Sequence, residues 1–223
     1  MMSSRSRVRS LPQMGAVVGL AFAMLSAAGC SMPISLKYSP LAATEAIATG
    51  PTRPRAFVTR FSDERKGETV GEIKNTLGGT AKKLVTTDDV GSLFAEAATD
   101  ALNKAGLVAH LHSERTAEGD IPAAELAGYD LVVGGRIKEF EVVSQPGWDT
   151  LKVTSRAVIE LGVRKGGKTE WIGPIEGTAE RREVSYIQSQ GLTNGLDSAL
   201  QNCMRNMIKH LKASGVLESP PAN

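Results

Sequence analysis

The sequence contains few of the residues that form covalent cross-links, metal sites or aromatic clusters. Among its 223 residues are two cysteines and three histidines, and aromatic residues make up 4% of the chain. At most one intrachain disulfide is possible, so an apolar core has to hold the fold together. Zinc sites use three or four protein ligands, whereas His110 and His112 are close in sequence and His210 is distant from both. We therefore expect solvated surface histidines, and no metal or cofactor.

Motifs of the common hydrolases are also missing. No G-x-S-x-G occurs to place a serine nucleophile on a strained turn. The adjacent carboxylates Asp88 and Asp89 precede an apolar-periodic segment, where carboxylates commonly cap a helix. Cys203 lies within the apolar stripe of a second predicted helix, which favours a buried structural thiol over a reactive one. We therefore expect a protein that is not an enzyme.

One phosphate-binding pattern is present and has to be judged from its neighbours. Residues 162–169, GVRKGGKT, match G-x-x-x-x-G-K-[ST] at every fixed position. A phosphate loop joins a buried strand to a helix whose N-terminal amides bind the phosphates. The following residues alternate in polarity and reach Gly173 and Pro174 within five positions, which predicts a strand and not a helix. We therefore predict a β-hairpin with Gly166 and Gly167 in its turn, and no nucleotide ligand.

The N-terminal residues have the layout of a signal peptide. Three arginines, Arg5, Arg7 and Arg9, precede an apolar run from Met14 to Leu25, and small residues follow this run. The run is shorter than a transmembrane helix, which needs about 20 apolar residues. We therefore expect residues 1–29 to be a signal peptide that is removed on export.

The segment LSAAGC, which ends at Cys30, resembles the processing box of bacterial lipoproteins. The match has one departure, because Ala27 stands where such boxes usually carry leucine. The resemblance implies that Cys30 carries acyl chains such as palmitate, and two or three chains suffice for stable anchoring. Ser31, in place of an aspartate after the cysteine, implies the periplasmic leaflet of the outer membrane. Ordinary secretion into the soluble periplasm, with a free Cys30, is the alternative.

The net charge argues against a nucleic-acid partner. The full chain carries 26 Lys and Arg against 24 Asp and Glu. Without the three arginines of the leader, 23 Lys and Arg face 24 Asp and Glu, which leaves a net charge of −1. Nucleic-acid binding usually requires a basic surface. We therefore expect the membrane, reached through the lipid anchor, and an envelope component as partners, and no nucleic acid.

The exported part divides into a tether, one domain and a short tail. Residues 30–54 contain four prolines and no period of a helix or strand, which indicates a lipidated, flexible tether with a span of about 25–30 Å. The alternative is that Leu36 and Tyr38 pack against the domain as a short strand. We assign residues 55–213 to a single α+β domain and expect a disordered tail over residues 214–223.

Periodicity within the domain predicts a mixed, largely antiparallel β-sheet with two main helices packed on one face. Strict alternation of apolar and polar residues from Leu151 to Arg164 is typical of a strand with one solvent-exposed face. Apolar residues recur at three-and-four spacing in residues 88–106 and 193–212, which predicts the two helices. Because proline cannot donate to a ladder, Pro174 is expected in an edge strand or at a bulge.

Two surface features are candidates for recognition. Ser62–Glu68 is the most charged run of the domain, and it either contacts a partner or forms a solvated loop, which is the commoner outcome. The residues Gln145–Trp148, QPGW, predict a turn. Trp148 in this turn is either an exposed interface anchor or a side chain folded over the sheet edge.

Residues 55–211 as a whole resemble the YajG-type family of outer-membrane lipoproteins. The resemblance rests on the leader and on the segments FVTRFSDERKG, SLFAEAATDALNKAGL, YDLVVGGRIKEF and GLDSALQNCMRNMIKHL. It implies a periplasm-facing α+β domain on a lipid anchor, with no established enzymatic activity. We therefore expect a non-enzymatic bacterial envelope lipoprotein that binds another envelope component, a protein or a glycan. The alternative is an auxiliary lipoprotein subunit of an envelope ABC-type lipid transport system.

Overall fold

The computed structural model describes residues 31–42, 44, 53–117, 121–165, 168–183 and 189–215. The chain divides into two compact units, Met1–Cys30 and Ser31–Asn223, and all described residues belong to the second. The elements of this unit are, in chain order, β1 (Ser31–Pro33), β2 (Arg55–Arg60), β3 (Ser62–Asp63), β4 (Thr69–Lys74), β5 (Thr80–Val85), α2 (Val90–Lys104), β6 (Val108–Thr116), α3 (Ala123–Leu126), β7 (Leu131–Pro146), β8 (Leu151–Lys165), β9 (Lys168–Glu183) and α4 (Ser189–Ala213). The predicted α+β fold class is confirmed.

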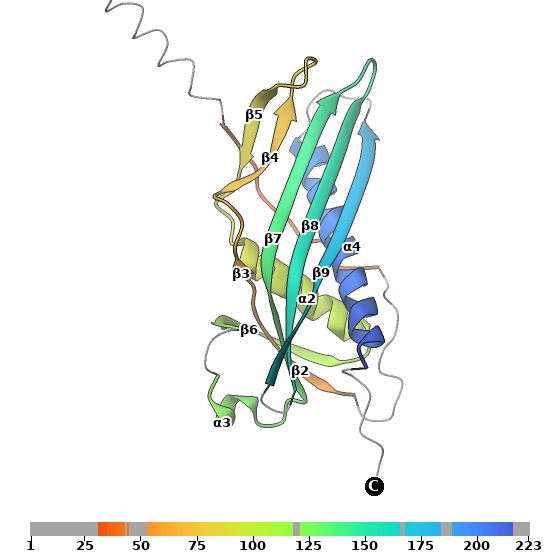
Figure 1. The fold of residues 1–223 in the computed structure, drawn as a ribbon. Coiled ribbons are helices and arrows are strands. Elements are labelled where there is room, and N and C mark those ends of the chain that lie inside the picture. Colours follow the sequence, from red (N-terminus) through yellow and green to blue (C-terminus); the bar gives the residue numbers. More distant parts are fainter. Residues whose placement is uncertain are drawn as a thin grey trace, which may run out of the picture. The chain divides into compact units, whose positions relative to one another are not determined.

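The sheet is organised around β7. One edge of β7 pairs antiparallel with β8, which pairs in turn with β9. The other edge pairs in parallel with three short strands that follow one another along the chain: β2 opposite residues 131–133, β3 opposite residues 136–137 and β4 opposite residues 142–144. Beyond these, β6 pairs with β2, and β5 and β1 continue the sheet from β4 (Figure 1). The sheet is thus mixed, and its longest ladders are antiparallel, as expected.

The octapeptide at residues 162–169 lies in the β8–β9 hairpin. Lys165 and Lys168 are opposite each other as the last pair of this antiparallel ladder. A strand therefore follows the pattern, and the helix that a phosphate loop requires is absent there, as predicted from the sequence. Gly166 and Gly167 lie outside the described residues. Pro174 lies in β9, which pairs with β8 alone and changes register between residues 172 and 175, so both features expected of a strand proline are present.

Both main helices cover one face of the sheet, as predicted (Figure 1). Asp89 caps the start of helix α2, and its side chain accepts a hydrogen bond from the Ser92 backbone N–H. The chain leaves the helix through Gly106 at a φ of 99°. Helix α4 packs on β9 and β8 through its apolar stripe. Cys203 lies in this stripe and is fully buried, and burial raises the pKa of its thiol to about 12. The predicted structural thiol is confirmed.

The predicted tether is wrong for residues 31–42, which pack against the domain. Ser31–Pro33 forms a strand parallel to β5, and the Ile34 N–H continues the pairing with a hydrogen bond to the Val85 carbonyl. The side chains of Ile34, Leu36 and Leu41 are buried in the main core. We call residues 31–42 the N-terminal strap. Within the predicted tether, the lipidation site Cys30, residue 43 and residues 45–52 lie outside the described residues, as do the leader and residues 216–223 of the predicted tail.

Carboxylates at the helices hold the N-terminal strap in place. Leu36 donates its N–H to Asp88 at 2.6 Å. Asp100 on α2 accepts the Tyr38 hydroxyl at 2.6 Å and the Leu41 N–H at 2.9 Å. Burial raises the pKa of Asp100, but the bonds from Tyr38, Lys104 and Leu41 outweigh burial and lower the pKa overall. A segment with no period of its own is therefore ordered by side chains that lie about 50 to 160 residues away in the sequence.

Candidate functional site

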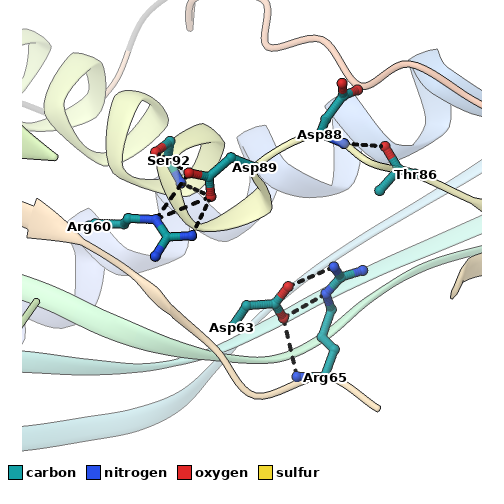
Figure 2. A network of polar contacts seen from close by, with 7 residues as sticks. All are labelled: Arg60, Asp63, Arg65, Thr86, Asp88, Asp89 and Ser92. Atoms are coloured by element: carbon teal, nitrogen blue, oxygen red, sulfur yellow. Dashed lines mark hydrogen bonds and ion pairs between the residues drawn. The ribbon is translucent and has the colours of Figure 1, made fainter. Parts of the chain in front are cut away.

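The charged loop after β3 is held by its own ion pair. The guanidinium of Arg65 donates to both carboxylate oxygens of Asp63, from Nε at 2.9 Å and from Nη2 at 2.8 Å (Figure 2). The Arg65 side chain is only 7% exposed. Burial raises the pKa of Asp63, and the hydrogen bond and charge of Arg65 outweigh that effect and lower it. Asp63 is therefore occupied within the loop and does not extend toward a partner.

Arg65 retains one nitrogen without a hydrogen bond. Its Nη1 is buried and has no hydrogen-bond partner among the described residues. In Figure 2 the two other guanidinium nitrogens point toward Asp63, and the third points away from it. A buried donor without an acceptor costs about 1–3 kcal/mol.

Arg65 lines a surface groove where the pairing of β7 is interrupted. On the edge away from β8, β3 pairs with β7 up to Ile137 and β4 resumes at Val142. Between them the chain leaves the sheet as the charged loop, and a groove of about 510 Å³ opens at this place. Its lining includes four cations, Arg65, Lys66, Lys83 and Lys138, and four carboxylates, Glu64, Glu72, Glu139 and Glu141.

Ion pairs connect charged side chains in and beside this groove. Glu64 contacts Lys138 at 2.6 Å and Arg136 at 3.5 Å, and Glu160 contacts Lys138 at 3.1 Å. The pKa of Glu64 is lowered, and the hydrogen bond from Lys138 is the largest cause of this shift. Charged side chains are thus held in position before any partner arrives, which reduces the entropy cost of binding.

A second groove continues the same charged face. It has a volume of about 350 Å³, shares Glu141 and Val143 with the first groove, and extends across β8 and β9 to Glu180. Arg156 in its lining bonds Glu139 at 2.9 Å and Glu176 at 2.9 Å. Ligand sites for acyl chains are mostly apolar, whereas charged and hydroxyl side chains dominate these two grooves.

The lining of the larger groove consists mainly of charged side chains. No serine, cysteine or histidine lines the larger groove, and Thr69 is its sole hydroxyl residue. A nucleophile paired with a base is therefore missing from that lining. The groove presents charged side chains of both signs. They lie beside a stretch of β7 that has no strand partner on that edge.

The histidines occupy two different environments. His112 stacks on Phe57 with ring centroids 3.7 Å apart, and its Nε2 lies 3.2 Å from the Tyr129 hydroxyl. The predicted solvated position is therefore wrong for His112, which completes a small aromatic cluster beneath α3. His110 and His210 are exposed, as expected. The described residues contain no group of three or more potential ligands placed to hold a metal ion.

Trp171 lies on the charged face and not on the core face where the alternation of β9 places it. The register change between residues 172 and 175 moves it to the other side of the sheet. There its ring covers Gly162, where a Cβ would lie 3.1 Å from it, and the Arg136 guanidinium stacks 4.0 Å from the ring centre. The first glycine of the phosphate-loop pattern thus makes room for an indole ring.

The start of α2 lies beside the charged loop and carries a pH-dependent contact. Arg60 donates to both oxygens of Asp89, the helix cap, at 2.8 to 3.2 Å (Figure 2). Hydrogen bonding from Arg60, helped by Ser92 and opposed by burial, lowers the pKa of Asp89 to about 2. Because this pKa is depressed, the contact stabilises the fold above pH 4 and is lost as the pH falls toward 2.

Asp89→Asn is expected to remove this pH dependence. Asparagine caps a helix as well as aspartate does, so the variant loses the ion pair but keeps the cap. We expect a loss of up to about 1 kcal/mol in unfolding free energy at pH 7, since the pair is exposed, and no difference from the parent near pH 2. Urea unfolding of the variant and the parent at both pH values measures this difference in unfolding free energy. An equal loss at pH 7 and pH 2 would contradict the ion-pair account.

Comparison with known proteins gives similarity to solved structures alone. No protein-family model matches the chain, and no curated protein matches it. Protein XCC0632 from Xanthomonas campestris has a TM-score of 0.46 at 10% identity, covering 83% of this chain and 96% of its own. The hypothetical protein CT253 from Chlamydia trachomatis has a TM-score of 0.45 at 12% identity, covering 75% and 100%. Lipoprotein GNA1162 from Neisseria meningitidis has a TM-score of 0.29 at 21% identity, covering 69% and 99%. Similarities this weak transfer no function to the chain.

Proposed function

We propose that the chain is a non-enzymatic bacterial envelope lipoprotein of the YajG type, anchored to the outer membrane through acyl chains on Cys30. The leader and the LSAAGC segment support the anchor. Within the described part of the chain, no helix is both long and apolar enough to cross a bilayer. The α+β domain faces the periplasm and binds another envelope component in the charged groove beside β7.

The interrupted pairing of β7 beside the charged groove is the observation that carries the binding proposal. The groove is lined by four cations and four carboxylates. An extended segment of another protein can place its polar groups against these side chains. Such a segment can also pair with the free edge of β7 at residues 138–141, as in recognition by strand addition. The partner class that fits best is therefore a polar, extended stretch of protein.

A photo-crosslinking residue at position 66 tests this proposal. Lys66 is exposed in the groove lining, and Glu96 on α2 is exposed elsewhere, which makes position 96 the matched control. In intact cells that produce the full exported chain, we expect a discrete adduct from position 66 and none from position 96. Peptides of a second protein in a tryptic digest of the adduct are expected, whereas removal of the added mass by glycosidases would assign a glycan.

Arg65→Ala in the crosslinking chain should abolish the adduct, with Lys83→Ala as a second variant in case the first unfolds. The melting temperature of each purified variant shows whether the fold is intact. Identical adducts from positions 66 and 96, or an adduct that survives both substitutions, would contradict a binding site in the groove.

A further inference from the structure

Two hairpin turns lie at the same end of the sheet. Strand β4 runs parallel to β7 with Ile73 opposite Ser144, so the β4–β5 turn at residues 75–79 and the β7–β8 turn at residues 147–150 both follow at that end. Figure 1 shows both turns at the top of the molecule. We call these two turns the hairpin tips.

Each tip carries one large apolar side chain in full contact with solvent. Leu77 is 93% exposed and Trp148 is 103% exposed, which settles the alternatives for Trp148 in favour of an exposed side chain. The next most exposed large apolar residue of the described set is Trp171, at 38%. Tryptophan is enriched at the interface between membrane and water, because its ring is apolar and its N–H is polar.

The N-terminal strap begins at Ser31, near this end of the sheet. Ser31 is opposite Lys83 on β5, and Lys83 is opposite Glu72 on β4. Glu72 is in turn opposite Val143 on β7. Five residues separate Val143 from Trp148, which at the rise of a strand is about 15 Å. Because β1 runs parallel to β5, it leads away from the tips, so Ser31 is the residue of β1 nearest to them.

The charges at this end favour an anionic surface. Lys82 and Lys83 are exposed on β5, and Arg181 and Arg182 are exposed on β9. Lys74 and Lys152 pair with Glu72 and Glu180, so these two pairs cancel. Asp149 and Glu183, which is opposite Leu151 in the ladder, are the remaining carboxylates at this end, so four cations face two carboxylates. A surplus of cations beside an apolar tip is the arrangement that binds anionic lipid headgroups.

We propose that the hairpin tips dock the domain onto the same membrane that holds its acyl chains. Leu77 and Trp148 enter the headgroup region of an anionic bilayer, and the exposed lysines and arginines contact lipid phosphates. This inference rests on the anchor at Cys30 proposed above. It replaces a free tether by a fixed orientation, with the long strands rising from the membrane and the groove at residues 139–141 about 20 Å above it.

Fluorescence of the acylated chain in vesicles tests this orientation. The chain has two tryptophans, so Trp171→Phe leaves Trp148 as the only one, and Trp148→Phe leaves Trp171 as the matched control. The vesicles contain phosphatidylethanolamine and phosphatidylglycerol, with or without brominated acyl chains that quench nearby indoles. We expect about twofold or stronger quenching of Trp148 with a blue shift of its emission. Trp171 pairs with Gly162, about 40 Å down the sheet, and should be unaffected.

The outcomes separate this inference from the anchor. Equal emission of Trp148 with and without bromine, in protein whose mass shows acylated Cys30, would overturn the docking and leave the anchor standing. A blue shift of Trp148 emission in native envelopes, without quenching by brominated lipids in vesicles, would show that the tips bind a protein, which also overturns it. Cys30 without acyl chains in native material would overturn both proposals.

Discussion

Gly177→Ala is expected to lower the free energy of unfolding by about 3 kcal/mol, the upper part of the range for overpacked sites. A Cβ at this position would lie 2.1 Å from the Cys203 nitrogen and 2.3 Å from the Ala199 carbonyl oxygen. These are backbone atoms of α4, so no side chain can move aside. Asn202 and Asn206 hold the helix against β9 by donating to the carbonyls of Thr178 and Glu176 at 2.7 Å.

Gly79→Ala is the matched control, because the nearest atom there is the amide of the Asn75 side chain at 3.2 Å. Urea unfolding of both variants measures the difference. A Gly177→Ala variant within about 0.5 kcal/mol of the parent would mean that α4 does not approach β9 as closely as the structure shows.

Leu41→Ala is expected to cost about 2–4 kcal/mol, as for other buried leucines. The side chain is 2% exposed, and its backbone N–H is bonded to Asp100. A domain that began at residue 55, with a free tether before it, would lose almost nothing. Leu77→Ala is the control, since a side chain that is 93% exposed should change stability by less than about 0.5 kcal/mol. Equal stability of the two variants would contradict the docked strap.

The same substitution links the N-terminal strap to membrane orientation. If the strap detaches, the slack between Cys30 and the domain grows, and the hairpin tips are no longer held at the bilayer. We therefore expect Leu41→Ala to weaken the quenching of Trp148 in brominated vesicles, whereas Leu77→Ala should weaken it without loss of stability. The two variants together distinguish the contributions of the covalent anchor, the strap and the tips to membrane docking.

The sequence alone predicts the elements that are determined by residues close to one another in the chain. The period of α2 with its cap at Asp89 and the alternation of β8 are both contained in short windows. The apolar stripe of α4 likewise placed Cys203 in the core. In each case neighbouring residues alone determine which face is buried.

Features that depend on distant residues were not visible in the sequence. The N-terminal strap is ordered by Asp88, Asp100 and Asp197, none of which is marked as its partner by any pattern. The register change in β9 moves Trp171 to the opposite face of the sheet. The groove exists because two short strands pair with β7 and leave a gap between them, and such a gap follows from tertiary pairing alone.

The mass of the N-terminal residue tests the central claim most directly. We propose to purify the native protein from membranes and to measure its intact mass and that of its N-terminal peptide. The account predicts a chain that begins at Cys30 and carries two or three acyl chains, and a Cys30→Ser variant that leaves the membrane fraction. A native chain that retains its leader, or one with an unmodified Cys30 in the soluble periplasm, would contradict it.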